Sequence, residues 1–279
     1  MAQKVALITA GTAGLGAQIA RVLAPDFRLV GNIVLSIQST SDHDLQELDQ
    51  AVNFANNRAR GQALIEELHK IPSTSGSEQS PRFELLQADV GDRPSVKQLV
   101  EDTITKFGRL DVVVSNAGWT RVTNFNNLDE GMEDEDWDKC FLYNVKSHLW
   151  LMHAAKTHLE SSEGAFITTA SIAGVKPSGS SLPYSVTKAA AIHLSKALAI
   201  ICSPKIRVNS VSPGLLLTDW GLSFGPEKIE KATKATKLQR LATVEVSETY
   251  TLAFLSIMDA DNCARMSPIK FVCSQRQSR

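Results

Sequence analysis

Short apolar runs alternate with longer amphipathic stretches along most of this 279-residue chain, and this alternation constrains its fold more strongly than any other feature. Short apolar runs bounded by turn residues are typical of buried strands, whereas apolar residues recurring on one face of a longer stretch are typical of helices. Strands that alternate with helices are joined by right-handed crossovers, which place the strands parallel and the helices on both faces of the sheet. We therefore predict an α/β fold with a doubly wound parallel sheet, in a single domain over residues 1–279.

The individual elements follow from the same pattern. After Pro94, which suits the first turn of a helix, the side chains of Val96, Leu99 and Ile104 fall on one helical face. The other predictions are strands at 5–9, 83–87, 110–115, 165–169 and 206–211 and helices at 15–23, 94–107, 137–159 and 184–201.

The composition excludes several classes of protein. The formal net charge is −1 and the pI is about 6.6, so no basic surface indicates binding to nucleic acid. The four cysteines are scattered without a C-x-x-C pair, which indicates reduced thiols and neither a disulfide framework nor a zinc site. The apolar run at 5–8 is too short for a signal peptide, and no stretch approaches the roughly 18 apolar residues of a membrane span. We therefore expect a cytoplasmic protein with neither a membrane nor a nucleic acid as partner.

The acidic run at 129–138 permits two interpretations. Its carboxylates could ligate a metal ion, or they could lie in a solvated loop at the N-terminus of a helix, where the helix dipole favours negative charge. We favour the second interpretation and predict no metal site.

A glycine-rich turn follows the first predicted strand, with the sequence T-A-G-T-A-G-L-G from Thr9 to Gly16. Glycines let the backbone turn tightly and approach a pyrophosphate, which then lies at the N-terminus of the next helix. An ordinary strand–helix turn is the alternative. The position of the turn, directly after an apolar strand and at the start of a helix, favours a dinucleotide site.

This turn resembles the T-G-x-x-x-G-x-G signature of the short-chain dehydrogenase/reductase family, with Ala10 in place of the first glycine. We expect Gly11 to supply the same backbone freedom. The resemblance covers roughly residues 4–30 and 53–255, and further motifs follow in the family's order. They are A-D-V with Asp89, N-A-G with Asn116, the helix asparagine Asn144, Ser171, Y-x-x-x-K with Tyr184 and Lys188, and V-N-S-V-S-P-G at 208–214 with Thr218 behind it.

The resemblance implies a Rossmann-like sheet and a role for each of these residues. The catalytic group would be Ser171, Tyr184, Lys188 and Asn144, with Asn144 holding a water that links Lys188 to solvent. The cofactor would be bound by the turn and by the later motifs, namely Gly11, Gly14, Leu15, Gly16, Asp89 beside the adenine ring, Asn116, Tyr184, Lys188, Leu216 and Thr218.

The spacing of Tyr184 and Lys188, four residues apart, places both side chains on one face of a helix. A free tyrosine has a pKa of about 10 and is a poor acid–base catalyst at neutral pH. A nearby ammonium stabilises the phenolate, so we expect Lys188 to lower that pKa. Tyr184 would give its proton to a carbonyl oxygen held by Ser171 as hydride reaches the carbon. The alternative is an ordinary tyrosine and lysine on a partly exposed helix.

The region after the turn bears on the choice of cofactor. NAD sites of this kind carry a carboxylate about 20 residues after the glycines, which accepts a hydrogen bond from the ribose 2′-hydroxyl. Residues 27–40 contain no Asp or Glu. Residues 31–51 resemble an insertion, because joining 27–30 to 52–58 restores a strand and a polar loop with Arg58. Arg58 could pair with a 2′-phosphate, which indicates NADP(H) in preference to NAD(H). Deleting residues 31–51 is therefore expected to preserve folding and NADPH binding.

Two further segments bear on the substrate and on the sheet edge. Residues 258–279 lack the strand motif with which the family completes its sheet, although residues 269–273 could form a short substitute strand. The loop at 217–241 combines Trp220 and Phe224 with several lysines. We expect this loop to cover a partly apolar, medium-sized ketone or secondary alcohol.

Together these features predict an NADP(H)-dependent oxidoreductase that transfers a hydride between nicotinamide and a ketone or secondary alcohol. One alternative is a nucleotide-binding family member with a regulatory role and little or no turnover. Another is a dehydratase or epimerase, since such enzymes on this fold also use a tyrosine and a lysine. The resemblance further implies a homodimer or homotetramer, because family members pair the helices predicted at 137–159 and 184–201.

Overall fold

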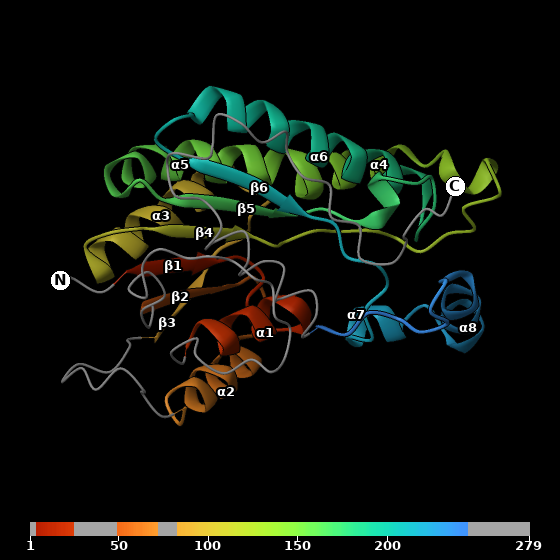
Figure 1. Ribbon diagram of the computed structural model, residues 1–279, viewed down its shortest axis with the longest axis horizontal. Coiled ribbons are helices and arrows are strands. Elements are labelled where there is room, and N and C mark those ends of the chain that lie inside the picture. The colour runs from red at the N-terminus through yellow and green to blue at the C-terminus, as the bar shows by residue number, and fades with distance from the viewer. Residues whose placement is uncertain (1–3, 25–48, 72–82, 245–279) are drawn as a thin grey trace.

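Six strands form one parallel sheet within the residues that the computed structural model describes, which are 4–24, 49–71 and 83–244 (Figure 1). The strand order is β3-β2-β1-β4-β5-β6. The order reverses between β1 and β4, and sheets of this kind bind ligands outside the carboxyl ends of the strands at that point. The strands are β1 (Val5–Ile8), β2 (Asp49–Phe54), β3 (Phe83–Gln87), β4 (Val112–Ser115), β5 (Ala165–Thr169) and β6 (Arg207–Val211).

Helices cover both faces of this sheet, α1 and α2 on one side and α3, α5 and α6 on the other (Figure 1). The predicted doubly wound α/β fold is therefore confirmed. The helices are α1 (Gly14–Leu23), α2 (Arg58–Leu68), α3 (Arg93–Phe107), α4 (Asp134–Phe141), α5 (Ser147–Ser162), α6 (Leu182–Cys202), α7 (Asp219–Leu222) and α8 (Pro226–Ala235), with shorter turns η2 (Asp129–Gly131), η3 (Leu142–Lys146) and η4 (Ile172–Gly174).

The central strand β1 is buried from both sides. Val5 and Leu7 belong to the cluster of core side chains under α3, α5 and α6, and Ala6 and Ile8 belong to the cluster under α1 and α2. A parallel sheet is covered in this way because its crossover helices lie on both faces. This double burial explains why β1 is a continuous apolar run with no polar alternation.

The second strand differs from the prediction, because β2 already begins inside the supposed insertion. Residues 49–51 pair in parallel with β1, and the buried Gln50 side chain donates through Nε2 to the Ala20 carbonyl at 3.1 Å. Backbone pairing with both β1 and β3 favours a strand here over a loop. Deleting 31–51 would remove these three paired residues and put residues 28–30 in their places, and the predicted insertion stays a prediction. Residues 27–30 lie outside the described residues, as do 258–279.

The acidic run at 129–138 opens α4, with Asp134, Glu135 and Asp136 in the first turn of that helix. This confirms the predicted place of these carboxylates at a helix N-terminus. Asp136 is buried and accepts a hydrogen bond from Nε of Arg121 at 2.6 Å. Within the described part of the chain, no group of three or more His, Cys, Asp or Glu side chains could hold a metal ion.

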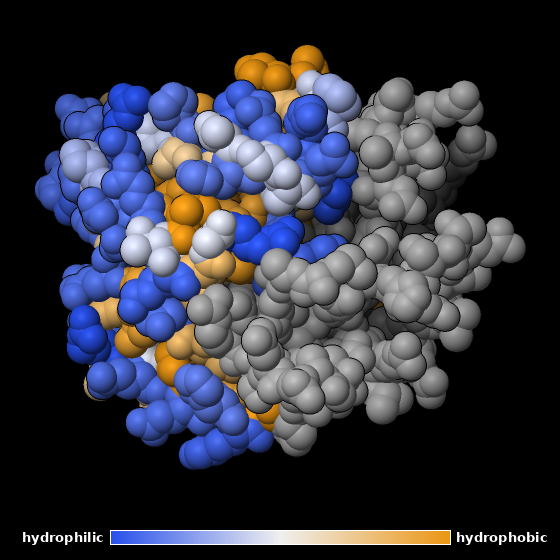
Figure 2. All heavy atoms as spheres, turned by 90° about the vertical axis from the view of Figure 1, so that its left-hand side faces the viewer, coloured by the Kyte–Doolittle hydropathy of each residue, from blue (hydrophilic) through white to orange (hydrophobic). Residues whose placement is uncertain are grey.

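Helix α6 is strongly apolar, and it both passes a test for membrane-spanning helices and exposes apolar side chains. By length and composition alone it could cross a membrane, with a mean hydropathy of 1.3, but it packs on β6 and η4 as a core helix does. Its last turns nevertheless expose Ile200 and Ile201, which are 81% and 68% accessible. Figure 2 shows hydrophobic atoms projecting at the top of the face formed by the amino ends of the strands, where α6 lies.

Asn53 joins the carboxyl end of β2 to its neighbours. Its buried side chain donates through Nδ2 to the carbonyl oxygens of Leu86 and Ala88, at 3.3 and 3.2 Å, and accepts from the Ala10 amide at 3.3 Å. Buried backbone groups need such partners, because they have no access to water. One side chain therefore ties together the ends of three strands beside the glycine turn.

Replacing Asn53 should destabilise the protein. Asn53→Ala is expected to lower the free energy of unfolding by about 2 kcal/mol, because buried backbone groups lose their partners. Urea denaturation followed by circular dichroism measures this change. The matched control is Asn56→Ala, whose side chain is exposed and which should change stability by no more than about 0.5 kcal/mol. Equal values for the two variants would show that Asn53 does not support the sheet.

Candidate functional site

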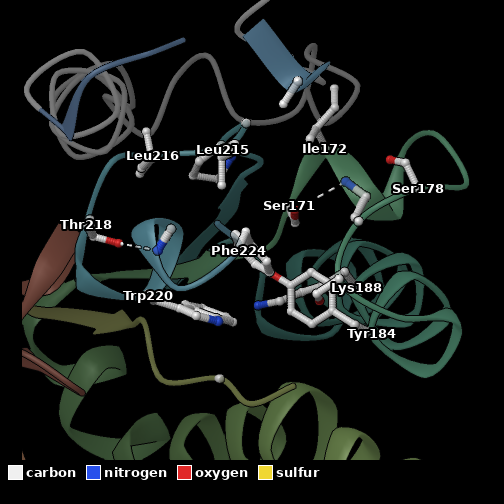
Figure 3. Close-up of a pocket in the computed structure, with 18 of the residues that line it drawn as sticks. Ser171, Ile172, Ser178, Tyr184, Lys188, Leu215, Leu216, Thr218, Trp220 and Phe224 are labelled. Carbon is white, nitrogen blue, oxygen red and sulfur yellow. Dashed lines mark hydrogen bonds between the residues drawn. The ribbon is translucent and has the colours of Figure 1, made fainter. Parts of the chain in front are cut away.

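A cavity of about 870 Å³ opens at the carboxyl ends of the strands. Its walls come from the turn after β1, the ends of β5 and β6, the start of α6, and the segment of α7 and α8 (Figure 3). This is the crevice in which sheets of this topology bind ligands. The predicted site residues that line it are Gly14, Leu15, Asn116, Ser171, Tyr184, Lys188, Leu216 and Thr218.

The backbone of the glycine-rich turn corrects one expectation. Ala10 itself adopts the left-handed conformation, with φ of 47°, whereas Gly11 is not among the residues with positive φ. Gly11 serves packing instead, since a Cβ there would lie 2.8 Å from Cγ1 of Val52 on β2. Gly11 therefore does not supply the backbone freedom of the expected glycine. Ala10, which carries a side chain, adopts the left-handed conformation at this turn itself.

The later glycines of the turn shape a cradle for a phosphate. A Cβ at Gly16 would lie 2.3 Å from the Ala10 carbonyl oxygen, and one at Gly14, where φ is 51°, would lie 3.2 Å from Cγ2 of Thr218. The N-cap of α1 is Ala13, which makes no side-chain hydrogen bond to the helix. The first amides of α1 thus face the cavity without a capping side chain, which fits the pyrophosphate of a dinucleotide.

Three side chains from two elements converge in the cavity (Figure 3). Ser171 follows β5 and caps η4, where its Oγ accepts from the Ala173 amide at 3.2 Å. Tyr184 and Lys188 share one face of α6, and the Lys188 Nζ lies 5.6 Å from the centre of the Tyr184 ring. The structure therefore brings together the predicted serine, tyrosine and lysine.

The protonation of this group differs from what the spacing predicted. Burial raises the pKa of Tyr184 to about 12, while a hydrogen bond with Ser171 acts in the opposite direction. Burial lowers the pKa of Lys188 to about 8, and its Nζ donates to the Thr169 carbonyl at 2.8 Å. Desolvation thus outweighs the expected stabilisation of a phenolate by Lys188. In this state the tyrosine is a protonated acid at neutral pH, and the expected lowering of its pKa is not found.

Asn144 lies in a π-helical turn, η3, which interrupts the single helix predicted at 137–159. Its amide is fully engaged: Oδ1 accepts from the Trp119 amide at 2.8 Å, and Nδ2 donates to the Trp119 carbonyl at 2.9 Å and to Oγ1 of Thr187 at 3.1 Å. Turns of this type are frequent at functional sites, because the extra residue redirects a side chain. Asn144 therefore positions the loop after β4 against α6, beside Lys188. The water predicted on Asn144 stays a prediction.

Asn116 links the glycine turn to β5. Its Nδ2 donates to the Ala10 carbonyl at 3.4 Å, and its Oδ1 accepts from Oγ1 of Thr169 at 3.0 Å. Oγ1 of Thr9 accepts from the amides of Asn116 and Ala117, at 2.9 and 3.2 Å. Sequence reasoning missed Thr9 and Thr169 as site residues, because their roles depend on strands that are far apart in the chain.

Four predicted cofactor residues are not among those that line the cavity, namely Gly11 and Gly16 of the turn, Asp89 and Arg58. Asp89 accepts from the Gly91 amide at 2.8 Å and from the Tyr143 hydroxyl at 3.3 Å. Arg58, the first residue of α2, places its guanidinium 5.5 Å from the centre of the Phe54 ring. The contact of Asp89 with an adenine ring and that of Arg58 with a 2′-phosphate therefore remain predictions.

Arg60 is the cation from α2 that reaches the cavity. It lines the wall and pairs with Asp219 of α7, with Nη2 and Oδ2 2.9 Å apart. Sequence reasoning missed it, although Arg58 and Arg60 stand two residues apart. Two residues along a helix correspond to a turn of about 200°, so only one of the two can face the site.

Gly174 was also missed, and its role is steric. It ends η4, and a Cβ there would lie 2.4 Å from the carbonyl carbon of Lys188 and 2.6 Å from the Ala189 nitrogen. The absence of a side chain lets η4 pack directly on the backbone of α6. Because Ser171 precedes η4, this contact sets the distance between Ser171 and the Tyr184–Lys188 face.

The predicted covering loop does lie over the site. Trp220 of α7 meets Tyr184 edge to face, with ring centres 5.9 Å apart, and Phe224 lines the same cavity (Figure 3). Residues of the loop line the cavity as far as Leu241. The wall around Tyr184 is therefore largely aromatic and apolar.

Comparisons with known proteins agree with this geometry. The family model described as short chain dehydrogenase matches residues 51–228. The chain is 32% identical to tropinone reductase-like 3 of Erythroxylum coca, over 92% of this chain and 87% of that protein. It is 29% identical to the 3-oxoacyl-[acyl-carrier-protein] reductase of Staphylococcus aureus (strain N315), over 91% and 90% of the two chains. Its fold matches the 3-ketoacyl-(acyl-carrier-protein) reductase of Brucella melitensis complexed with NADH, with a TM-score of 0.75 at 20% identity and coverage of 98% and 97%.

The chain therefore belongs to the short-chain dehydrogenase family. It is an oxidoreductase of the kind that acts on carbonyl or alcohol groups with NAD(H) or NADP(H). The Rossmann-like sheet, the cavity at its switch point and the uncapped start of α1 suit that cofactor.

Relief of the strained turn should stabilise the protein. Ala10→Gly is expected to raise the free energy of unfolding by about 1 kcal/mol, because glycine adopts positive φ without steric cost. Thermal and urea unfolding measure the change. The control, Ala13→Gly, changes a residue with φ of −150° and should give a small loss, since glycine only adds freedom to the unfolded chain there. A loss of stability in Ala10→Gly would contradict the inferred strain.

A side chain at Gly174 should separate the catalytic groups. Gly174→Ala is expected to reduce kcat at least about tenfold and stability by about 1–3 kcal/mol, because the methyl group pushes η4 away from α6. The control is Gly108→Ala, at the end of α3, where φ is 79° and no atom lies near the new methyl group. That variant should lose stability and retain kcat. Retention of kcat in Gly174→Ala would show that this contact does not set the site geometry.

Proposed function

We propose that this protein is an NADP(H)-dependent reductase and dehydrogenase that interconverts a ketone and a secondary alcohol. The observation that carries the proposal is the convergence of Ser171, Tyr184 and Lys188 on one cavity, which continues into the glycine turn at the start of α1. The names of the relatives, a tropinone reductase-like protein and a 3-oxoacyl reductase, support the same reaction class.

In the reductive direction each group has one task. A dinucleotide held with its pyrophosphate at the first amides of α1 would be the source of the hydride for the carbonyl carbon. The Ser171 hydroxyl donates a hydrogen bond to the carbonyl oxygen and stabilises the negative charge that develops there. Tyr184, which is protonated at neutral pH, gives its proton to that oxygen, so the carbonyl becomes an alcohol. The Lys188 ammonium then stabilises the phenolate left on Tyr184.

The residues around the end of β2 support NADP(H) over NAD(H). The strand ends at Phe54 and continues as Ala55-Asn56-Asn57, without the carboxylate that would accept from a ribose 2′-hydroxyl. Arg58 and Arg60 open α2 directly afterwards, and a guanidinium pairs well with a phosphate. Since the Brucella melitensis structure contains NADH, the test of this preference uses both cofactors in parallel.

The remaining expectations form part of the proposal. Self-association as a homodimer or homotetramer is supported by exposed apolar side chains on the two helices concerned, including Leu149 of α5 and Val186 and Ile200 of α6. The cytoplasmic location stays a prediction.

Removal of the proton donor should abolish most turnover. In a screen of the purified protein against a panel of ketones, oxidation of NADPH is followed by absorbance, with NADH in parallel. Tyr184→Phe is expected to reduce kcat by about 10²–10⁴-fold, because general acid catalysis contributes that factor. The Kd for NADPH should stay within about twofold of wild type. A variant that keeps more than about a tenth of wild-type kcat would remove Tyr184 from the acid–base role.

The ionisation of Lys188 should determine how kcat/KM for NADPH depends on pH. Because the pKa of Lys188 is lowered to about 8, the ammonium is present below that pH and lost above it. kcat/KM for NADPH, which reports groups of the free enzyme, should therefore be level at neutral pH and fall as pH rises through about 8. In Lys188→Arg the guanidinium keeps its charge, so the decline should move to higher pH. An unchanged profile in that variant would assign the decline to another group.

A further inference from the structure

The outer wall of the cavity is formed by one face of α8. Lys228, Lys231, Ala232 and Ala235 all line the cavity, and their spacing is that of a single helical face. The small alanines leave space at this wall, and the two lysines carry positive charge into it. This wall touches the loop after β4, because Nζ of Lys228 donates to the carbonyl of Thr123 at 3.3 Å.

The charged groups of the cavity are strongly unbalanced. Its lining contains the cations Arg60, Lys188, Lys228 and Lys231 but a single carboxylate, Asp219. Asp219 is already paired with Arg60, and Lys188 donates to the Thr169 carbonyl. The lysines of α8 therefore have no carboxylate partner in the lining.

The two lysines of α8 differ in their surroundings. Lys228 has the Thr123 carbonyl as its acceptor and lies near Glu130, whose pKa it helps to lower. The side-chain ammonium of Lys231, which is exposed, makes neither a hydrogen bond nor an ion pair with any residue in the described part of the chain. Its ammonium is thus available to a ligand in the cavity. The next lysine of the helix, Lys234, lies off this face and pairs with Glu230.

Part of the cavity lining is apolar. Ile172, Trp220 and Phe224 line this region, and Trp220 packs against the Tyr184 ring. A ligand whose carbonyl reaches Tyr184 would place an apolar body against these side chains. Its far end would then meet the ammonium groups of α8.

We propose that the substrate is a ketone with an apolar body and an anionic group, a carboxylate in the simplest case, that pairs with Lys231 and secondarily with Lys228. This inference rests on the proposed function and names its substrate class. The anion would be bound at the wall formed by α8, apart from the cofactor phosphates at the start of α1. Charge-assisted hydrogen bonds of this kind are among the stronger polar contacts.

The experiment compares a keto acid with its neutral analogue. 5-Oxo-5-phenylpentanoate and its primary amide share the ketone and the apolar body and differ only in the terminal group, which is an anionic carboxylate in the first and a neutral amide in the second. The wild-type protein should reduce the acid with a kcat/KM at least about tenfold higher than the amide, and added salt should diminish this preference. In Lys231→Gln the ratio of acid to amide should fall at least about fivefold. The matched control is Lys234→Gln, which removes a lysine of the same helix outside the cavity and should leave the ratio unchanged.

A binding measurement separates this inference from the proposed function. Calorimetry gives the Kd of 5-phenylpentanoate and of 5-phenylpentanamide, which have no ketone to reduce. Tighter binding of the carboxylate that is lost in Lys231→Gln supports the anion site even if no ketone is turned over, in which case only the reductase proposal fails. Turnover of both ketones at equal kcat/KM, with equal Kd values for the two analogues, would overturn the anion site and leave the reductase proposal standing.

Discussion

The site depends on hydrogen bonds that tie together the carboxyl ends of four neighbouring strands. Thr9 after β1 binds the amides that follow β4, and Asn53 at the end of β2 binds the Ala10 amide. Asn116 then connects the Ala10 carbonyl to Thr169 on β5. These contacts hold the phosphate-binding turn and the catalytic end of β5 in one frame. Because the side chains of Thr9 and Asn53 are buried and those of Asn116 and Thr169 half-buried, water cannot easily replace the hydrogen bonds that they make.

The same contacts adjoin the proposed catalytic residues Tyr184 and Lys188, whose buried surroundings disfavour charge. Burial lowers the pKa of the Lys188 ammonium to about 8 and raises the pKa of the Tyr184 hydroxyl to about 12, so it makes the charged form of each group less favourable, although the ammonium persists at neutral pH. The Thr169 carbonyl, at the end of β5, gives the ammonium an acceptor in this environment. The low polarity that makes the charged state costly also strengthens any interaction with charge that develops during the reaction.

Close backbone packing at two glycines sets the remaining distances between the elements of the site. Gly174 lets η4 touch the backbone of α6, and Gly16 lets α1 approach the Ala10 carbonyl. Ala10, by contrast, is a residue with a Cβ that adopts positive φ, where a glycine would be unstrained. A strained residue at a ligand-binding turn persists only because the surrounding contacts hold it, and here Asn53 and Asn116 bind its amide and its carbonyl.

Most of the fold and the identity of the central residues were predictable from local pattern. Apolar runs marked β1, β4 and β5, because a strand buried on both faces must be largely apolar. The spacing of Tyr184 and Lys188 placed them on one face of α6, since helical geometry alone determines that relation. What the pattern could not supply was any property set by neighbours distant in the chain. The start of β2 depends on pairing with β1 and β3, and the choice of Arg60 over Arg58 depends on where α2 begins.

The sequence by itself determined which residue types were available for the chemistry and the order in which they occur along a parallel α/β chain. Only the tertiary structure decided their ionisation and their partners. Burial, not the charge of Lys188, controls the pKa of Tyr184, and a π-helical turn, not a regular helix, aims Asn144 at the loop after β4. The physical reason is that desolvation and hydrogen bonding depend on which segments meet in space, whereas helical and strand periodicity depend only on neighbours along the chain.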